Sequence, residues 1–206
     1  MRSLPVVAEG ARFAFAQNLE EVAAFVGLDG TGHTRLPPAE IYRKWLVVLA
    51  AAQRHIRQLP DDRIEQDVLP DRPRSVRSLA QHVFRIVEVY VSAALGKTEY
   101  APRDTNIPEA EERLYLTGAA VAEYGDGTIA RLRAWWEGCA DGAFEQSMTT
   151  SYGVQPLHEV FERSAWHSAQ HVRQLAAILE REGIVPDGPL TADDLKGLPL
   201  PEGLWS

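Results

Sequence analysis

Two histidines lie four residues apart towards the end of the chain, in the run His167-Ser168-Ala169-Gln170-His171. Residues at i and i+4 lie one above the other on an α-helix, so both imidazoles can reach a single metal ion. Both also fall on the apolar stripe of the surrounding sequence, which directs them into the interior, where an imidazole needs a hydrogen-bond or metal partner. Such a pair arises by chance on the order of once in six chains of this composition, so two ordinary core histidines are the alternative interpretation.

His82 adds a third imidazole from a different part of the chain. It lies one turn from Leu79 and one turn from Ile86, on the apolar side of a second expected helix. Three neutral imidazoles supply three nitrogens to one metal ion and leave a coordination position for water or substrate, which is the layout of a catalytic site. The sequence therefore predicts that His82, His167 and His171 bind one divalent metal ion.

Other chemistries fit the sequence less well. A helical His-Glu-x-x-His protease would need Glu where Ser168 stands, and a di-iron bundle would need Glu-x-x-His segments, which the segment 159–162 does not provide. The single cysteine, Cys139, excludes an intrachain disulfide and a cysteine-based zinc cluster. It has no base at a suitable spacing, so a core residue is the better interpretation than a nucleophile.

The remaining histidines receive more modest expectations. His55 borders the apolar stripe of the first long helix and could hydrogen-bond to a metal ligand. His158 follows a stripe position and is expected at the surface, and His33 lies in a linker and is expected in solvent.

Apolar residues recur at helical spacing in four segments, which must position these histidines. We expect helices over residues 37–59, 75–95, 128–139 and 156–182, with a weaker helix over 111–123 and a turn at Gly125-Asp126-Gly127. Residues 60–74, 97–110 and 147–155 are expected to be irregular. Four amphipathic helices with little strand signal predict a mainly α fold, a four-helix bundle.

The two ends of the chain fall outside the bundle pattern. Residues 1–33 are predicted to form a β-hairpin, a helix and a linker, and they resemble the second half of a glutaredoxin-type fold, although the Cys-x-x-Cys of the redox half is absent. A unit this small cannot fold alone, so we expect it to dock on the bundle or to pair its strands with another chain, and docking should shield Phe13, Phe15, Leu19 and Val22. The alternative is a mobile tail. Residues 34–183 are assigned to the bundle, and residues 184–206, with four prolines and three glycines, to an extended tail.

The composition of the chain limits the classes of partner and the cellular compartment that we expect. The chain has 206 residues, a formal net charge of −8 and no run of Lys or Arg, which argues against nucleic acid and anionic membrane as partners. The longest apolar stretch, residues 45–52, is too short to span a bilayer, and the first residues lack the apolar run of a signal peptide. We therefore expect a cytoplasmic protein.

Residues 75–82 (Ser-Val-Arg-Ser-Leu-Ala-Gln-His) and 166–175 (Trp-His-Ser-Ala-Gln-His-Val-Arg-Gln-Leu) resemble the DinB/YfiT-like family of metal-dependent enzymes. The resemblance covers about residues 38–182. It implies a four-helix bundle, often dimeric, in which one histidine of the second helix and a His-x-x-x-His pair of the last helix bind a divalent metal, nickel or zinc among others. Gln174 matches a position where that family often has glutamine, which implies either a contact to a ligand or simple packing.

The same resemblance suggests a reaction class. Several relatives are thiol transferases or isomerases that use a low-molecular-weight thiol such as bacillithiol, mycothiol or glutathione. We therefore expect a metal-dependent thiol S-transferase or isomerase that acts with such a thiol on a small electrophilic substrate, as a homodimer. The alternative is a non-catalytic metal-binding, small-molecule-binding or stress-associated protein, whose structural metal site would be closed by a fourth protein ligand.

Overall fold

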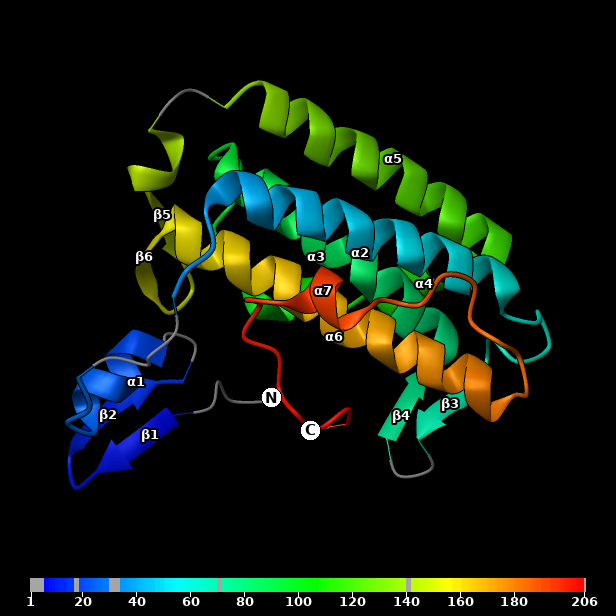
Figure 1. The fold of residues 1–206 in the computed structure, drawn as a ribbon, viewed down its shortest axis with the longest axis horizontal. Coiled ribbons are helices and arrows are strands. Elements are labelled where there is room, and N and C mark those ends of the chain that lie inside the picture. The colour runs from blue at the N-terminus through cyan, green and yellow to red at the C-terminus, as the bar shows by residue number, and fades with distance from the viewer. Residues whose placement is uncertain (1–5, 17–18, 30–33, 70–71, 140–141, 206) are drawn as a thin grey trace.

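The computed structural model describes residues 6–16, 19–29, 34–69, 72–139 and 142–205. Four long helices of this described chain form a bundle, which confirms the mainly α fold (Figure 1). They are α2 (Pro38–Gln58), α3 (Val76–Ala94), α5 (Gly118–Glu137) and α6 (Leu157–Arg181).

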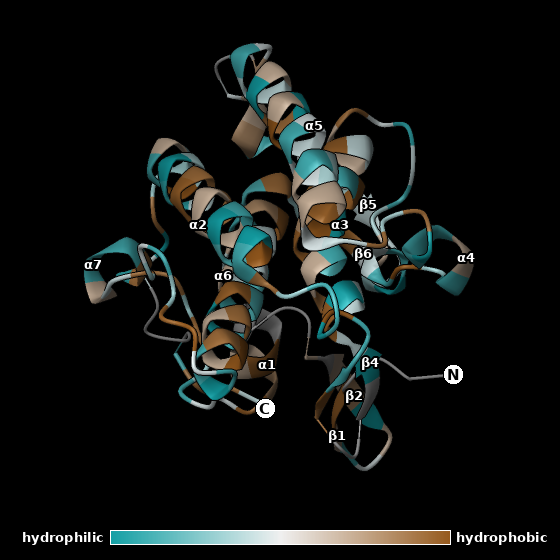
Figure 2. Cartoon of the chain, turned by 90° about the vertical axis from the view of Figure 1, so that its right-hand side faces the viewer, coloured by the Kyte–Doolittle hydropathy of each residue, from teal (hydrophilic) through white to brown (hydrophobic). Residues whose placement is uncertain are grey.

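The helices are not connected in simple up-and-down order. Helices α2 and α3 each pack mainly on α5 and α6, so these two consecutive helices occupy diagonal corners of the bundle. Figure 2 views the bundle roughly end-on. The arrangement makes α3 and α6 direct neighbours, and these are the helices that carry the three candidate histidines.

Large aromatic side chains fill the centre of the bundle. The Tyr90 ring lies 5.7 Å from Trp45, 5.1 Å from Trp135 and 5.2 Å from Phe161, measured between ring centroids, so it contacts side chains of three other helices. Tyr90, Trp45 and Phe161 are fully buried. Burial of such large apolar surfaces is the main favourable term in folding.

The sequence explains where the two helices that carry the histidines begin and end. Ser75 caps α3, because its Oγ accepts a hydrogen bond from the Ser78 backbone N–H at 2.9 Å. Pro156 directly precedes α6, and Gly183, with a φ of 74°, follows its end. A left-handed conformation at that position favours glycine, so the sequence specifies the end of α6.

Helix α5 contradicts the prediction of a weak helix, a turn at residues 125–127 and a separate helix from Thr128. It runs unbroken from Gly118, and Thr117 is its cap, with Oγ1 accepting from the Ala120 N–H at 3.1 Å. A Cβ at Gly125 would lie 2.4 Å from Cζ of Phe84 in α3. Gly125 is therefore present because α5 approaches α3 closely, and it does not break the helix.

Two β-hairpins replace segments that were expected to be irregular. Strand β3 (Asp67–Leu69) pairs with β4 (Arg72–Ser75), and β5 (Ser147–Thr150) pairs with β6 (Gly153–Pro156). Each hairpin leads without a gap into a helix that carries candidate ligands, α3 or α6. Three short elements complete the bundle connections: η1 (Pro102–Thr105), α4 (Glu109–Glu112) and η2 (Ala143–Glu145).

The N-terminal residues form the predicted hairpin and helix. Strands β1 (Val6–Glu9) and β2 (Arg12–Phe15) are antiparallel, α1 (Leu19–Phe25) packs on β2, and this unit lies at one end of the bundle (Figure 1). Phe13 is 60% exposed, so the expectation that the bundle shields it is wrong. The side chains of Phe15 and Leu19 lie outside the described part, and the division at residues 33 and 183 stays a prediction.

The tail after α6 lies along the bundle and contains the short helix α7 (Ala192–Leu195), which the prediction of an extended tail did not include (Figure 1). Lys44 on α2 donates hydrogen bonds to the backbone oxygens of Asp193 at 2.9 Å and Asp194 at 3.1 Å. Gln58 at the end of α2 donates to the Val185 oxygen at 2.9 Å. Backbone groups of the tail are therefore satisfied by side chains of the bundle. Within the described residues, no helix is long and apolar enough to cross a lipid bilayer.

Candidate metal centre

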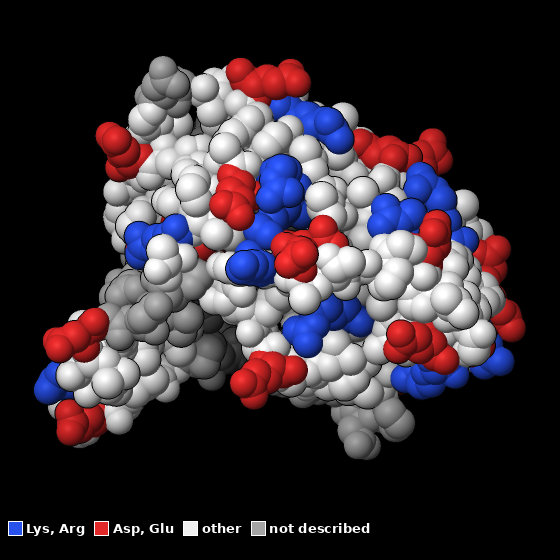
Figure 3. All heavy atoms as spheres, viewed as in Figure 1, with Lys and Arg blue, Asp and Glu red and all other residues white. Residues whose placement is uncertain are grey.

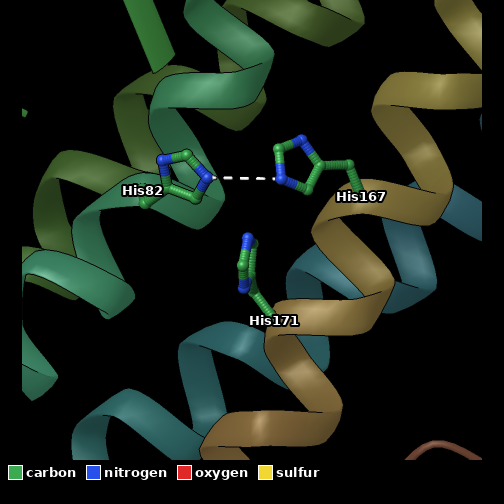
Figure 4. A group of neighbouring side chains, drawn as sticks. All are labelled: His82, His167 and His171. Atoms are coloured by element: carbon green, nitrogen blue, oxygen red, sulfur yellow. Dashed lines mark hydrogen bonds between the residues drawn. The ribbon is translucent and has the colours of Figure 1, made fainter. Parts of the chain in front are cut away.

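The three predicted histidines lie together between α3 and α6. One nitrogen from each of His82, His167 and His171 lies within 4.8 Å of the others, and Nε2 of His82 is 3.4 Å from Nε2 of His167. Figure 4 shows the three rings converging on one point, two from α6 and one from α3. Three imidazole nitrogens at these distances could hold one divalent ion.

Burial keeps these imidazoles neutral. His82 and His171 are 4% and 8% exposed, and His167 is half-buried. Burial and, to a smaller extent, the positive charge of Arg74 lower the pKa of His171 to about 4. Burial also lowers the pKa values of His82 and His167, and the other rings of the cluster add to the effect. All three side chains are thus in the neutral form that binds a metal.

Two of the rings are oriented by hydrogen bonds on the far side from the cluster. Nδ1 of His82 lies 2.5 Å from the Thr105 backbone oxygen, and Nδ1 of His171 lies 2.7 Å from Oε1 of Gln174. An oxygen of either kind only accepts, so each Nδ1 carries the hydrogen and each Nε2 presents a lone pair to the cluster. Second hydrogen bonds of this kind commonly orient metal-binding histidines.

The structure also leaves one nitrogen of the cluster unsatisfied. Nε2 of His171 is buried and has no hydrogen-bond partner in the described chain. Buried polar atoms are nearly always paired, so an unpaired nitrogen facing two other imidazole nitrogens calls for a ligand. The residues present therefore fit a divalent metal ion with nitrogen donors.

Ser168 ties the histidine segment of α6 to two neighbouring helices. Its Oγ accepts a hydrogen bond from Nε1 of Trp45 in α2 at 3.0 Å and lies 3.4 Å from the Val83 backbone oxygen in α3. Val83 follows His82 in sequence, so this buried contact lies beside the point where α3 and α6 bring their histidines together.

Two arginines place positive charge near the rings. Arg74 comes from β4, directly before the cap of α3, and Arg163 lies one turn before His167 on α6. Both charges lower the pKa of His167. A centre with this surrounding charge favours anionic ligands.

The remaining histidines and the cysteine stay outside the cluster. Among the described residues, no Cys, Asp, Glu or further His joins the three imidazoles. His55 is fully buried in α2, and His158 is half-buried with Nε2 2.8 Å from the Leu36 backbone oxygen. His33 lies outside the described residues. Cys139 is half-buried, and burial raises the pKa of its thiol, so it is not an activated nucleophile.

Sequence reasoning missed Thr105, which acts through its backbone. It ends the 3-10 turn η1, where its Oγ1 donates to the Pro102 oxygen at 2.7 Å, and this turn sets its carbonyl against His82. Every residue type has a backbone carbonyl, so the sequence does not show that the carbonyl of Thr105 contacts His82. Gln174, in contrast, is marked by the family resemblance.

The sequence of the chain matches the DinB superfamily. The model of this superfamily matches residues 42–175, well over half of the chain, and the protein belongs to it. A search of curated proteins finds no match.

Two of the solved structures that resemble the chain are crystal structures of one enzyme. The crystal structure of the mycothiol-dependent maleylpyruvate isomerase has a TM-score of 0.50 and 18% identity, and a histidine-to-alanine mutant of that enzyme has a TM-score of 0.47 and 15% identity. In both, the similarity covers 69% of this chain and 60% of the isomerase chain. At 18% identity, the likeness to the first of these structures shows a shared fold alone.

Proposed function

We propose that the protein is a metal-dependent thiol S-transferase or isomerase that binds one divalent ion, nickel or zinc, on His82, His167 and His171. The observation that carries the proposal is the buried, unpaired Nε2 of His171, which faces the nitrogens of the two other rings. Three neutral imidazoles without a fourth Cys, Asp, Glu or His ligand in the described chain suit a site with an exchangeable position.

Each group around the centre has a role in this chemistry. A divalent ion bound there lowers the pKa of a thiol or water that occupies the exchangeable position. The Thr105 oxygen and Gln174 hold the rings of His82 and His171 in the tautomer that binds metal. Arg74 and Arg163 supply positive charge that favours a thiolate and an anionic electrophile.

The partner is a low-molecular-weight thiol, and the substrate is a small electrophile. The name of the structurally similar isomerase, which is mycothiol-dependent, supports a thiol partner for this member of the superfamily. We further propose a cytoplasmic homodimer without nucleic-acid or membrane partners. On the face seen in Figure 3, acidic and basic side chains are interspersed, and its described residues form no broad basic patch.

The second candidate is a non-catalytic protein in which the metal only braces α3 against α6. The strong burial of His82 and His171 favours it, because structural metal sites are closed to solvent. The two candidates differ in whether the bound ion can exchange a ligand with a thiol.

Metal content tests the site. Purified without a histidine tag, the wild-type protein should retain about one ion per chain by elemental analysis, and His82→Gln, His167→Gln and His171→Gln should retain far less. Glutamine keeps much of the histidine volume, and circular dichroism checks that each variant is folded. His158→Gln is the matched control from the same helix and should keep the ion. Full metal content in all three variants would place the site elsewhere.

Thiol assays separate the enzyme from the structural alternative. Metal-loaded and metal-free protein are compared with mycothiol, bacillithiol and glutathione in turn, with a chlorodinitrobenzene as the electrophile and loss of free thiol as the readout. The enzyme proposal expects metal-dependent loss of one thiol. The structural alternative expects that the metal-loaded protein consumes none of these thiols. It also expects that the visible absorption spectrum of the cobalt-substituted protein stays unchanged when thiol is added.

A further inference from the structure

The last described residues of the tail lie across α6 beside the metal centre. We call residues 201–205 the tail segment. Gln170 donates to the backbone oxygens of Gly203 at 3.0 Å and Leu204 at 2.7 Å, and Arg173 donates to the Pro201 oxygen at 3.0 Å. Trp205 packs against the apolar core. The tail segment is thus held by several contacts on the helix that carries two candidate ligands.

One of its hydrogen bonds continues to a candidate ligand. Nε2 of Gln174 donates to the Leu204 oxygen at 2.7 Å, and Oε1 of the same amide lies 2.7 Å from Nδ1 of His171. Gln174 is 7% exposed and His171 is 8% exposed, so water offers little competition for these bonds. A single buried amide therefore connects the tail backbone to the centre.

The donors and acceptors of these hydrogen bonds allow only one orientation of the Gln174 amide. A backbone carbonyl can only accept, so the Leu204 oxygen requires the NH2 of Gln174 on its side. The amide oxygen then faces His171 and can also only accept, which requires the hydrogen on Nδ1. Nε2 is left with a lone pair directed at the cluster. Without the Leu204 oxygen, the amide can turn over, present NH2 to Nδ1 and favour the tautomer with hydrogen on Nε2, which cannot bind metal.

We propose that Gln174 and the Leu204 carbonyl are positioning groups that fix the tautomer of His171, and that the tail segment is a built part of the metal centre. The metal-binding consequence rests on the proposed function, whereas the tautomer does not. His82 has the same arrangement in shorter form, because its Nδ1 meets the Thr105 carbonyl directly.

Variants of the full-length protein test each hydrogen bond between Leu204, Gln174 and His171 separately. Gln174→Leu removes both bonds, and Gln174→Glu keeps an acceptor for Nδ1 of His171 without needing Leu204 to orient it. The double change Gln170→Leu with Trp205→Ala loosens the tail segment and leaves Gln174 in place. Lys44→Met is the matched control, because Lys44 holds Asp193 and Asp194 of the same tail, outside the tail segment.

The first measurement needs no metal. In metal-free protein, 15N chemical shifts of the imidazole report which nitrogen of His171 carries the hydrogen. We expect the Nδ1–H tautomer in the wild type, in Gln174→Glu and in Lys44→Met, and a mixture in Gln174→Leu and in the loosened-tail variant. An unchanged tautomer in both of these last variants, with native amide spectra, would overturn the proposal.

The second measurement is zinc affinity by competition with a chelator. We expect Gln174→Leu and the loosened-tail variant to bind zinc about 10–100-fold more weakly, as for other partners of metal-binding histidines. In a Gln174→Glu background, loosening the tail should cost no affinity. An equal loss in that background would mean that the tail acts by another route and would contradict the proposal. A folded wild type that binds no zinc refutes the proposed function, and the tautomer measurement then still decides the positioning role.

Discussion

At the scale of single residues, the three imidazoles share a confined space without any charge of their own. Burial lowers the pKa of His82, His167 and His171, and Arg74 adds to the shift of each. A protonated ring here would meet two other rings and an arginine with little solvent to screen them. The metal-free protein is therefore sensitive to proton uptake at this point.

The first prediction at this scale concerns pH. The pKa of His171 is about 4 in the folded chain, below the ordinary value of 6.5 that applies to the unfolded chain. Between these values the unfolded state binds a proton that the folded state does not, so stability falls as pH falls from about 6.5 towards 4 and is fully present above 6.5. The melting temperature of metal-free protein should drop over that range.

The control for this prediction is the variant His171→Gln, which lacks one of the titrating rings. Its melting temperature should fall less steeply across the same range, since one fewer proton is taken up on unfolding. Equal slopes in the two proteins would show that other groups dominate the acid response and that His171 is not shifted.

The parts of the centre formed by side chains can be predicted from the sequence, and the parts formed by backbone atoms cannot. The helical spacing of His167 and His171, and the apolar face that holds His82, make these side chains predictable from the sequence alone. Thr105 acts through a backbone oxygen and Leu204 through another, and a backbone group leaves no trace in the residue type. The placement of Arg74 depends on the β3–β4 hairpin, whose strands of three and four residues are too short to show a strand pattern in the sequence.

At the scale of elements, α5 shows why a local rule fails. Glycine is a poor helix former, so the three glycines within α5 favour an interrupted helix on local propensity alone. The structure instead uses two of them for contact: a Cβ at Gly118 would lie 2.4 Å from the Ile56 oxygen in α2, and one at Gly125 would meet Phe84 in α3. Tertiary packing outweighs the intrinsic helix propensity here. The local sequence of α5 does not show which residues of α2 and α3 will pack against its glycines.

A pair of alanine substitutions tests this interpretation of α5. Gly127 has nothing within 4 Å of an added Cβ and is exposed, so Gly127→Ala should stabilise the protein by about 0.5–1 kcal/mol through helix propensity. Gly125→Ala gains the same propensity but overpacks against the Phe84 ring and should destabilise by about 1–3 kcal/mol. Denaturant unfolding measures both. Stabilisation by both changes would mean that α5 does not need a close approach to α3.

At the scale of the whole molecule, the N-terminal unit differs from the bundle in how much apolar surface it leaves uncovered. Val6, Phe13, Val26 and Leu28 are each 50% to 60% exposed, although the unit consists only of a hairpin and a seven-residue helix. So small a unit buries too little apolar surface to be stable alone. Strand edges and apolar side chains in this state favour association with a second copy of the chain.

The last prediction is that this N-terminal surface forms the proposed homodimer. Phe13→Asp introduces a charge at the 60% exposed side chain of β2, and burying that charge at an interface without a partner is costly. The variant should therefore sediment as a monomer in analytical ultracentrifugation at micromolar concentration, while the wild type sediments as a dimer. Leu114→Asp is the matched control, since Leu114 is 71% exposed in the connection between α4 and α5, far along the chain from this unit, and the variant should remain dimeric. A wild-type protein of one chain mass, or a dimer that survives Phe13→Asp, would contradict this interface.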